Sequence, residues 1–201
     1  MNRKLNIAVA GATGAVGEAM LSILAEYGYK GANVHALASA KSLGKSVTFG
    51  NRTLAVEVLE DFDFNGIDFA LFSAGASVSI EHAPRAAKAG CMVIDNTSAF
   101  RRDEDIPLVV PEINGDLLEN LPAGSIISNP NCSTIQMLIA IAPIHAIANT
   151  AHGALAGGGN DSCIACHGAS TEHKQKAARV APDVSRRGRI RSTVRQACVG
   201  H

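Results

Sequence analysis

Three glycines, Gly11, Gly14 and Gly17, stand in the stretch GATGAVG, directly after the apolar residues 5–10. That apolar run is short, carries no charge and ends at a glycine, which is typical of a buried parallel strand. Residues 15–27 then place apolar side chains at helical spacing, which predicts an amphipathic helix. A glycine triplet between a strand and a helix constrains the fold more than any other feature here, because it predicts the tight first turn of a βαβ unit.

The same alternation continues along the chain to about residue 148. Apolar runs predict further strands at residues 33–39, 54–59, 67–75, 91–98 and 124–130. Helical spacing predicts helices at residues 77–89 and 132–148 and a short one at 115–121, whereas residues 106–114 are expected to be extended. Strands that alternate with helices predict the α/β class, here a Rossmann-type parallel sheet with helices on both faces. Ligands of such sheets bind beyond the carboxyl ends of the strands.

The glycine loop predicts a dinucleotide site. Gly11 permits the tight turn, Gly14 lets the backbone approach a pyrophosphate at the helix N-terminus, and Gly17 lets the helix lie close to the strand. The alternative is an ordinary turn between a strand and a helix. The residues expected to bind the cofactor follow three strand ends: Gly11, Thr13, Gly14, Ala15, Val16, Gly17, Ser39, Lys41, Ser42, Ser73 and Gly75.

The end of the second predicted strand distinguishes NADP from NAD. An NAD site usually places Asp or Glu there to bind the ribose 2′-hydroxyl. This chain instead offers Ser39, Lys41, Ser42 and Lys45 in ASAKSLGK, and no acid. Hydroxyls and an ammonium group attract a 2′-phosphate that a carboxylate would repel, so the pattern predicts NADP. A purely solubilising surface loop is the alternative, chiefly for Lys45.

A cysteine opens the helix predicted at residues 132–148. Cys132 follows the turn Asn129-Pro130-Asn131 and precedes Ser133, so it lies at a helix N-terminus. The helix dipole stabilises a thiolate there, and the thiolate is the reactive form of cysteine. A small buried residue is the alternative reading. Because the position also lies on the ligand-binding edge, Cys132 is predicted to be a nucleophile, with Asn131 beside it.

A thiolate near a nicotinamide suggests one chemistry. The thiolate adds to an aldehyde, hydride leaves to NADP⁺, and the resulting thioester is released by an oxygen nucleophile. If that nucleophile is phosphate, a cation is needed, and Arg101 and Arg102 follow a strand end in DNTSAFRRDED. We choose Arg101 for phosphate, with hydrogen bonds from Asn96, Thr97 and Ser98. Ion pairs of the arginines with Asp103, Glu104 and Asp105 are the alternative.

The motifs GATGAVG, LASAKSLGK, FSAG, DNTSAFR, VPEIN and SNPNCST, in this order, resemble bacterial aspartate-semialdehyde dehydrogenase over residues 1 to about 145. The resemblance implies an NADP-dependent, phosphate-linked interconversion of aspartyl phosphate and aspartate semialdehyde, which leads to lysine, methionine and threonine. It implies that Cys132 is the nucleophile, that Asn131 lies in the site, and that Arg101 helps to bind phosphate. The N-acetyl-gamma-glutamyl-phosphate reductases share fold and chemistry, but Asn131 and Ser133 favour the aspartate enzyme.

The resemblance also implies three segments. Residues 1–130 are expected to form the NADP-binding domain, residues 131–148 the catalytic cysteine helix that begins a substrate and dimerisation domain, and residues 149–201 an atypical basic tail. The tail is poor in large apolar residues, and no aromatic residue follows Phe100. We therefore expect a disordered tail, and we interpret it as the product of a reading-frame shift near residues 146–150 in a family whose members form homodimers.

Residues 1–145 carry 10 Lys and Arg against 15 Asp and Glu, and the remaining residues carry 8 against 3. The basic tail contains Cys163, Cys166 and His167, whose spacing fits haem attachment or zinc binding, and a run of arginines at 186–191. We expect no metal and no nucleic acid, because nothing else in the sequence supports either.

We also find no targeting signal and no apolar run that could span a membrane, which predicts a cytoplasmic protein without membrane contact. The partners that the resemblance implies are the small-molecule substrate and phosphate. The alternative function, of a different class, is a catalytically inactive nucleotide-binding remnant.

Overall fold

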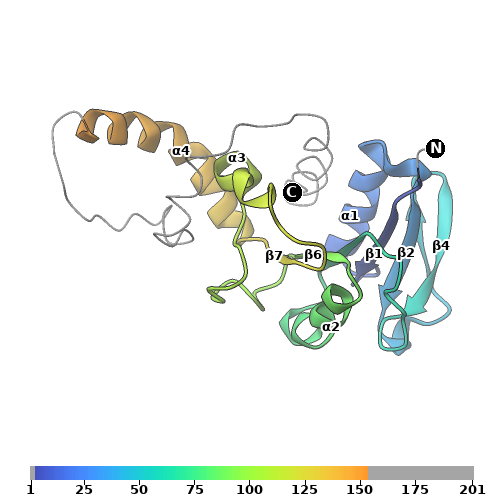
Figure 1. Ribbon diagram of the computed structural model, residues 1–201. Helices are drawn as coiled ribbons and strands as arrows, with labels where there is room; N and C mark the ends of the chain where they lie inside the picture. The colour runs from blue at the N-terminus through green and yellow to red at the C-terminus, as the bar shows by residue number, and fades with distance from the viewer. Residues whose placement is uncertain (1–2, 154–201) are drawn as a thin grey trace.

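The computed structural model describes residues 3–153. Their centre is a seven-stranded sheet with the strand order β3-β4-β2-β1-β5-β6-β7 (Figure 1). Every neighbouring pair is parallel except β3 and β4, which are antiparallel. The strands are β1 (Asn6–Ala10), β2 (Asn33–Ala38), β3 (Ser46–Phe49), β4 (Arg52–Val58), β5 (Phe69–Phe72), β6 (Met92–Asp95) and β7 (Ile126–Ser128). The predicted α/β class with a parallel sheet is confirmed.

Helices α1 (Ala15–Glu26) and α2 (Ala76–Lys88) cover opposite faces of the sheet. The alternation along β1 shows this directly. Ile7 and Val9 belong to the buried cluster that includes residues of α1, whereas Ala8 and Ala10 belong to the cluster that includes residues of α2. The remaining helices are α3 (Pro111–Asn114), α4 (Cys132–Gly153) and the 3-10 turns η1 (Tyr29–Gly31), η2 (Ala40–Ser42) and η3 (Gly115–Leu118).

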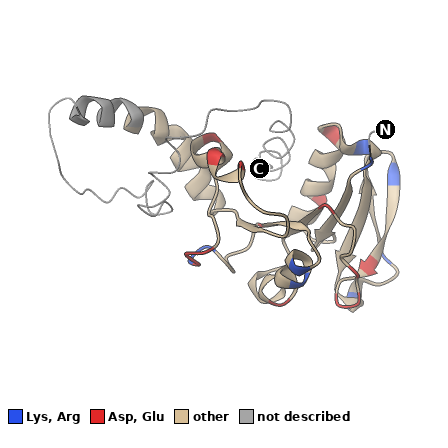
Figure 2. Ribbon diagram, in the orientation of Figure 1, with Lys and Arg blue, Asp and Glu red and all other residues tan. Residues whose placement is uncertain are grey.

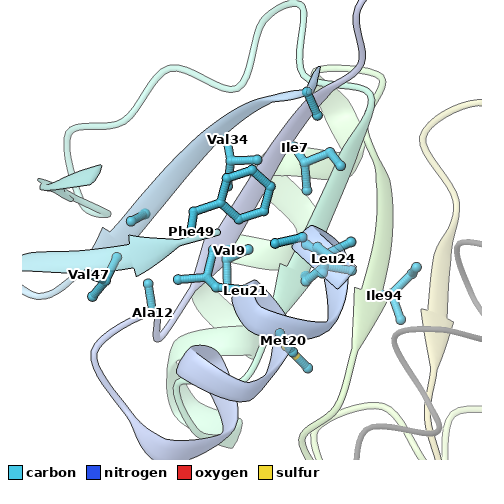
Figure 3. Packing of buried hydrophobic residues seen from close by; sticks show 14 of the residues in the cluster. Ile7, Val9, Ala12, Met20, Leu21, Leu24, Val34, Val47, Phe49 and Ile94 are labelled. Atoms are coloured by element: carbon cyan, nitrogen blue, oxygen red, sulfur yellow. The ribbon is translucent and has the colours of Figure 1, made fainter. Parts of the chain in front are cut away.

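The α1 face of the sheet is closed by large apolar side chains. Leu21 and Leu24 of α1 lie near Val9 of β1 and Phe49 of β3 (Figure 3). All four are at most 1% exposed. Each such side chain stabilises the fold by about 1.5–3 kcal/mol relative to an exposed position. This packing holds the first turn of α1, and with it the glycine loop, against the end of β1.

Two segments differ from the sequence predictions. Strand β3 was not predicted, because its alternating residues form only four positions within a polar stretch. The extended segment predicted at 106–114 is wrong in its second half, where α3 begins at Pro111. Two features favour this helix. Proline is favoured at the first helical position. The Asn114 side chain also holds the preceding residues, since it accepts from Val110 N at 2.7 Å and donates to Leu108 O at 2.9 Å.

The C-terminal ends of helices α1 and α4 also differ from the predicted ones. Helix α1 ends before Tyr27, which is 59% exposed and not part of the apolar face. Gly28 has a φ of +94°, a conformation that ends a helix and suits glycine. Helix α4 begins at Cys132 as predicted but continues beyond residue 148 to Gly153. It leads away from the sheet in Figure 1. The proposed tail lies outside the described residues, apart from the end of this helix.

Candidate active site

Polar loops gather at the carboxyl edge of the parallel sheet, as the sequence predicted. Because β2, β1, β5, β6 and β7 are neighbours in that order and parallel, the loops after them lie side by side. Four strand spacings of about 4.8 Å separate the first loop from the last, or about 19 Å. The edge between β1 and β5 is the point from which α1 and α2 leave toward opposite faces, which is where doubly wound sheets bind ligands.

The glycine loop has almost no room for side chains. A Cβ at Gly17 would lie 2.1 Å from Gly11 O, and one at Gly11 would lie 2.9 Å from Ala74 N in the loop after β5. Gly11 also has a φ of +89°. At Gly14, by contrast, a Cβ would meet only Gly11 O at 3.4 Å, and this residue is exposed at the N-cap of α1. The backbone at Gly14 and the first free N–H groups of α1 therefore suit a pyrophosphate.

The loop after β2 touches the glycine loop. Thr13 Oγ1 lies 3.5 Å from Ser42 Oγ, and the N–H groups of Gly11 and Ala12 donate to Leu37 O at 2.9 and 3.1 Å. Ser39 and Lys41 are exposed beside this contact, in and before η2. The predicted cofactor residues after β1 and β2 are thus brought together by the fold.

The acid on the strand beside β2, Glu57 of β4, is paired with a histidine and not with the loop after β2. Glu57 of β4 is in register with Leu37, which belongs to the cluster on the α2 face. Its carboxylate lies 2.8 Å from His35 Nδ1. The loop directly after β2, residues 39–45, contains no Asp or Glu, where an NAD site usually has one.

The loops after β5, β6 and β7 are joined by backbone hydrogen bonds. Ser73 donates to Ala10 O through both its N–H, at 2.9 Å, and its hydroxyl, at 3.1 Å. Asn96 N donates to Phe72 O at 2.9 Å, and Asn129 N donates to Asp95 O at 2.8 Å. Gly75, with a φ of +103°, forms the N-cap of α2. A continuous series of contacts therefore runs from the glycine loop to the turn before Cys132.

Arg101 lies across the last two loops. Its Nε donates to Asn129 O and its Nη2 donates to Asn96 O, both at 3.0 Å. Neither Arg101 nor Arg102 forms an ion pair with Asp103, Glu104 or Asp105, so the alternative reading of these arginines is not supported. The guanidinium has five N–H donors, and the bonds to the two carbonyls use only part of them. The half-buried cation keeps donors with which it can bind an anion.

Asp95 organises the loop that carries Asn96 and Arg101, and the sequence analysis did not single it out. Its carboxylate is fully buried and accepts from Ser79 Oγ at 2.7 Å, Thr97 Oγ1 at 2.9 Å and Thr97 N at 3.2 Å. The Thr97 hydroxyl is therefore engaged inside the loop, whereas Ser98 is exposed at its tip. An acidic residue at the end of an otherwise apolar strand, CMVID, was the available signal.

Cys132 is exposed and is the first residue of α4. The Asn131 side chain caps this helix, because its Oδ1 accepts from Ser133 N at 3.0 Å and lies 3.8 Å from Cys132 Sγ. No Asp, Glu, Lys or Arg occurs between Cys132 and Gly153, and the described part of α4 carries neither charge colour in Figure 2. The charges that act on the Cys132 thiol therefore come from the helix terminus and from neighbouring loops.

The second described cysteine has the opposite character. Cys91 is fully buried, and its thiol donates to Phe64 O at 3.4 Å. Burial, followed by the negative charge of Asp68, raises the pKa of Cys91 to about 11. The Cys91 thiol therefore stays neutral and unreactive at neutral pH. Of the two cysteines described, Cys132 is the candidate nucleophile.

Among residues 3–153, no three His, Cys, Asp or Glu side chains lie together as a metal site would require. The candidates Cys163, Cys166 and His167, and the arginines at 186–191, lie outside the described residues. In the part of the chain that the structure describes, no helix has the length and apolar character needed to cross a membrane.

The fold and the loops at its edge define a dinucleotide-binding α/β domain that continues into a helix headed by a cysteine. Residues 6–121 match the family model described as Semialdehyde dehydrogenase, NAD binding domain. The chain therefore belongs to the semialdehyde dehydrogenase family and contains its domain for a nicotinamide cofactor.

Individual relatives agree with this assignment. The chain is 52% identical to the aspartate-semialdehyde dehydrogenase of Legionella pneumophila over 145 residues, which cover 72% of this chain and 42% of the relative. It is 47% identical to that of Bacillus subtilis over 169 residues, or 81% of this chain and 48% of the relative. Aspartate semialdehyde dehydrogenase II of Vibrio cholerae, solved in complex with ASA, matches with 51% identity and a TM-score of 0.67 over 71% of this chain and 47% of the other. The matched region spans less than half the length of these relatives.

Proposed function

We propose that this chain forms the NADP-binding and cysteine-bearing part of an aspartate-semialdehyde dehydrogenase. The reaction converts L-aspartate 4-semialdehyde, phosphate and NADP⁺ into 4-aspartyl phosphate and NADPH, a step toward lysine, methionine and threonine. The observation that carries the proposal is the position of Cys132. It is exposed at the start of α4, and it directly follows the turn that Arg101 contacts, on the sheet edge that also carries the glycine loop.

The proposed chemistry uses three side chains of this region. The Cys132 thiolate attacks the aldehyde carbon and forms a C–S bond, and oxidation of that carbon yields a thioester on Cys132. NADP⁺, when bound, accepts the hydride from this carbon. A phosphate oxygen then attacks the thioester carbon, the C–S bond breaks, and the thiolate is regenerated. Arg101 neutralises the charge of the phosphate, and Asn131 orients the thiol.

The preference for NADP over NAD rests on the loop after β2. Ser39 and Lys41 are exposed next to the contact between Thr13 and Ser42, and Glu57 is paired with His35 instead of approaching this loop. A 2′-phosphate would find hydroxyl and ammonium donors here. The groups for the substrate carboxylate, the general base and the homodimer interface are expected beyond the region matched here, in analogy with the longer relatives.

The test is the formation of NADPH from aspartate semialdehyde and phosphate by the purified chain. We expect activity that Cys132→Ala abolishes and that the matched variant Cys91→Ser retains, because Cys91 is buried and neutral. Titration with NADP is measured on the same samples by fluorescence. Retained NADP binding without any NADPH formation would contradict the proposal and favour a catalytically inactive nucleotide-binding chain.

A further inference from the structure

We propose that Asn129 is a positioning residue that holds the Arg101 guanidinium beside Cys132 through the Asn96 side chain. The inference rests on the proposed function, since it assigns the origin of the positive charge at the nucleophile. The inference goes beyond the proposed function because it names Asn129, a residue that touches neither substrate nor cofactor in the proposed reaction.

The hydrogen bonds form a closed set of three residues. Asn129 Nδ2 donates to Asn96 Oδ1, whereas Arg101 donates to the main-chain oxygens of both asparagines at 3.0 Å. The two backbone acceptors belong to different loops, one after β6 and one after β7. The guanidinium can bond to both only while the two loops keep their spacing. The backbone bond from Asn129 N to Asp95 O holds the loops together, and the bond between the asparagine side chains adds a second tie next to the guanidinium.

The Asn129 side chain is buried and forms one hydrogen bond within the described residues. The residue is 4% exposed, and its Oδ1 is buried without a hydrogen-bond partner. Among the described residues, the bond from Nδ2 to Asn96 is therefore the hydrogen bond that orients the Asn129 amide.

The arrangement brings the Arg101 charge within reach of the thiol. Asn129 O accepts from Arg101, and Cys132 follows Asn129 by three residues, so their Cα atoms are at most about 11 Å apart. Adding the 3.0 Å bond and the reach of the thiol, the guanidinium lies at most about 20 Å from the Cys132 thiol. This is inside the Debye length of about 30 Å at 0.01 M salt. At such low salt the guanidinium should attract an anion that approaches the Cys132 thiolate.

The test compares alkylation of Cys132 by iodoacetate, an anion, with alkylation by iodoacetamide, which is neutral. The ratio of the two rates removes any change in thiolate fraction and reports only the charge near the thiol. Rates are measured on the full chain at 10 mM salt, and modification at Cys132 is quantified by fragment-ion mass spectrometry. The variants are Asn129→Ala, Arg101→Gln, the double variant and Asn96→Ala, with Asn120→Ala, an exposed asparagine, as the matched control.

We expect the ratio to fall about two- to fourfold in Arg101→Gln, the effect of one unit charge at about 20 Å near a protein surface at low salt. Asn129→Ala and Asn96→Ala should lower it to a similar value, the double variant should add nothing further, and Asn120→Ala should match the wild type. A ratio unchanged in Asn129→Ala and Asn96→Ala, or additive effects in the double variant, would overturn the proposal, as would a ratio insensitive to Arg101→Gln.

This readout needs no turnover, so its failure is distinguishable from failure of the proposed function. If NADPH formation is absent but the ratio follows the expected pattern, the positioning role stands while the enzymatic role falls. NADP titration of each variant checks folding, and Asn96→Ala tests the same hydrogen bond from its less buried side if Asn129→Ala does not fold.

Discussion

Replacement of Gly17 by alanine tests whether close contact between α1 and the glycine loop limits this fold. The added Cβ would lie 2.1 Å from Gly11 O and 2.7 Å from Ala12 Cα, both backbone atoms that no rotamer change can move. Overpacking of this kind costs about 3 kcal/mol at the upper end of its usual range. Alanine offsets about 1 kcal/mol of this through its higher helix propensity. We therefore expect a net loss of about 2 kcal/mol in the free energy of unfolding.

The assay is thermal unfolding followed by circular dichroism. A loss of about 2 kcal/mol corresponds to a midpoint lowered by about 4–8 °C for a chain of this size. Gly14→Ala is the matched control, because its Cβ would meet only one atom, at 3.4 Å, and its φ of −92° suits alanine. It should change the midpoint less but weaken NADP binding. A Gly17→Ala midpoint equal to that of the wild type would refute the reasoning.

Three further predictions concern buried and cofactor-facing groups. Because folding raises the pKa of Cys91 from 9.0 to about 11, its thiol contributes stability that is complete below pH 9 and is lost as the pH rises through 11. We measure the free energy of unfolding with urea between pH 8 and 11.5. Over this range, the wild type should lose up to about 2–3 kcal/mol more of this free energy than Cys91→Ser, and an equal pH dependence in both proteins would contradict the prediction. Ser39→Asp should weaken NADP binding at least about tenfold while sparing NAD, by fluorescence titration, whereas Ser46→Asp on β3 should change neither. Asp95→Ala should cost about 1–3 kcal/mol in urea unfolding, because Ser79 and Thr97 lose their acceptor, and stability equal to that of the exposed control Asp116→Ala would show that the buried carboxylate is dispensable.

The sequence was sufficient for those parts of the fold that depend on neighbouring residues. The strand, glycine loop and helix at residues 5–27 were predicted within one or two residues, as was the start of α4 at Cys132. Strand β3 was not, because its conformation comes from pairing with β4 and its four residues carry too little pattern of their own. The helix at Pro111 was misread because an apolar run before a proline resembles an extended segment.

The candidate site divides in the same way. Gly11, Gly17 and Cys132 were evident from the sequence, because a tight turn, a close approach or a helix start is a property of a few consecutive residues. The partners of Arg101 were not evident, since Asn129 lies 28 residues away along the chain and Asn96 lies 33 residues from Asn129. Such contacts depend on which strands are neighbours in the sheet.

The sequence by itself determined the local features of this protein: a glycine turn between a strand and a helix, hydroxyl and lysine groups after the second strand, and a thiol at the start of a helix. Only the tertiary structure decided how these groups meet. The strand order brings the loops after β6 and β7 together, so that Arg101 bonds to both and Asp95 becomes a buried acceptor for the loop between them. The physical reason is that backbone conformation is set by short-range sterics, whereas hydrogen bonds between loops form only after the sheet has fixed their distance.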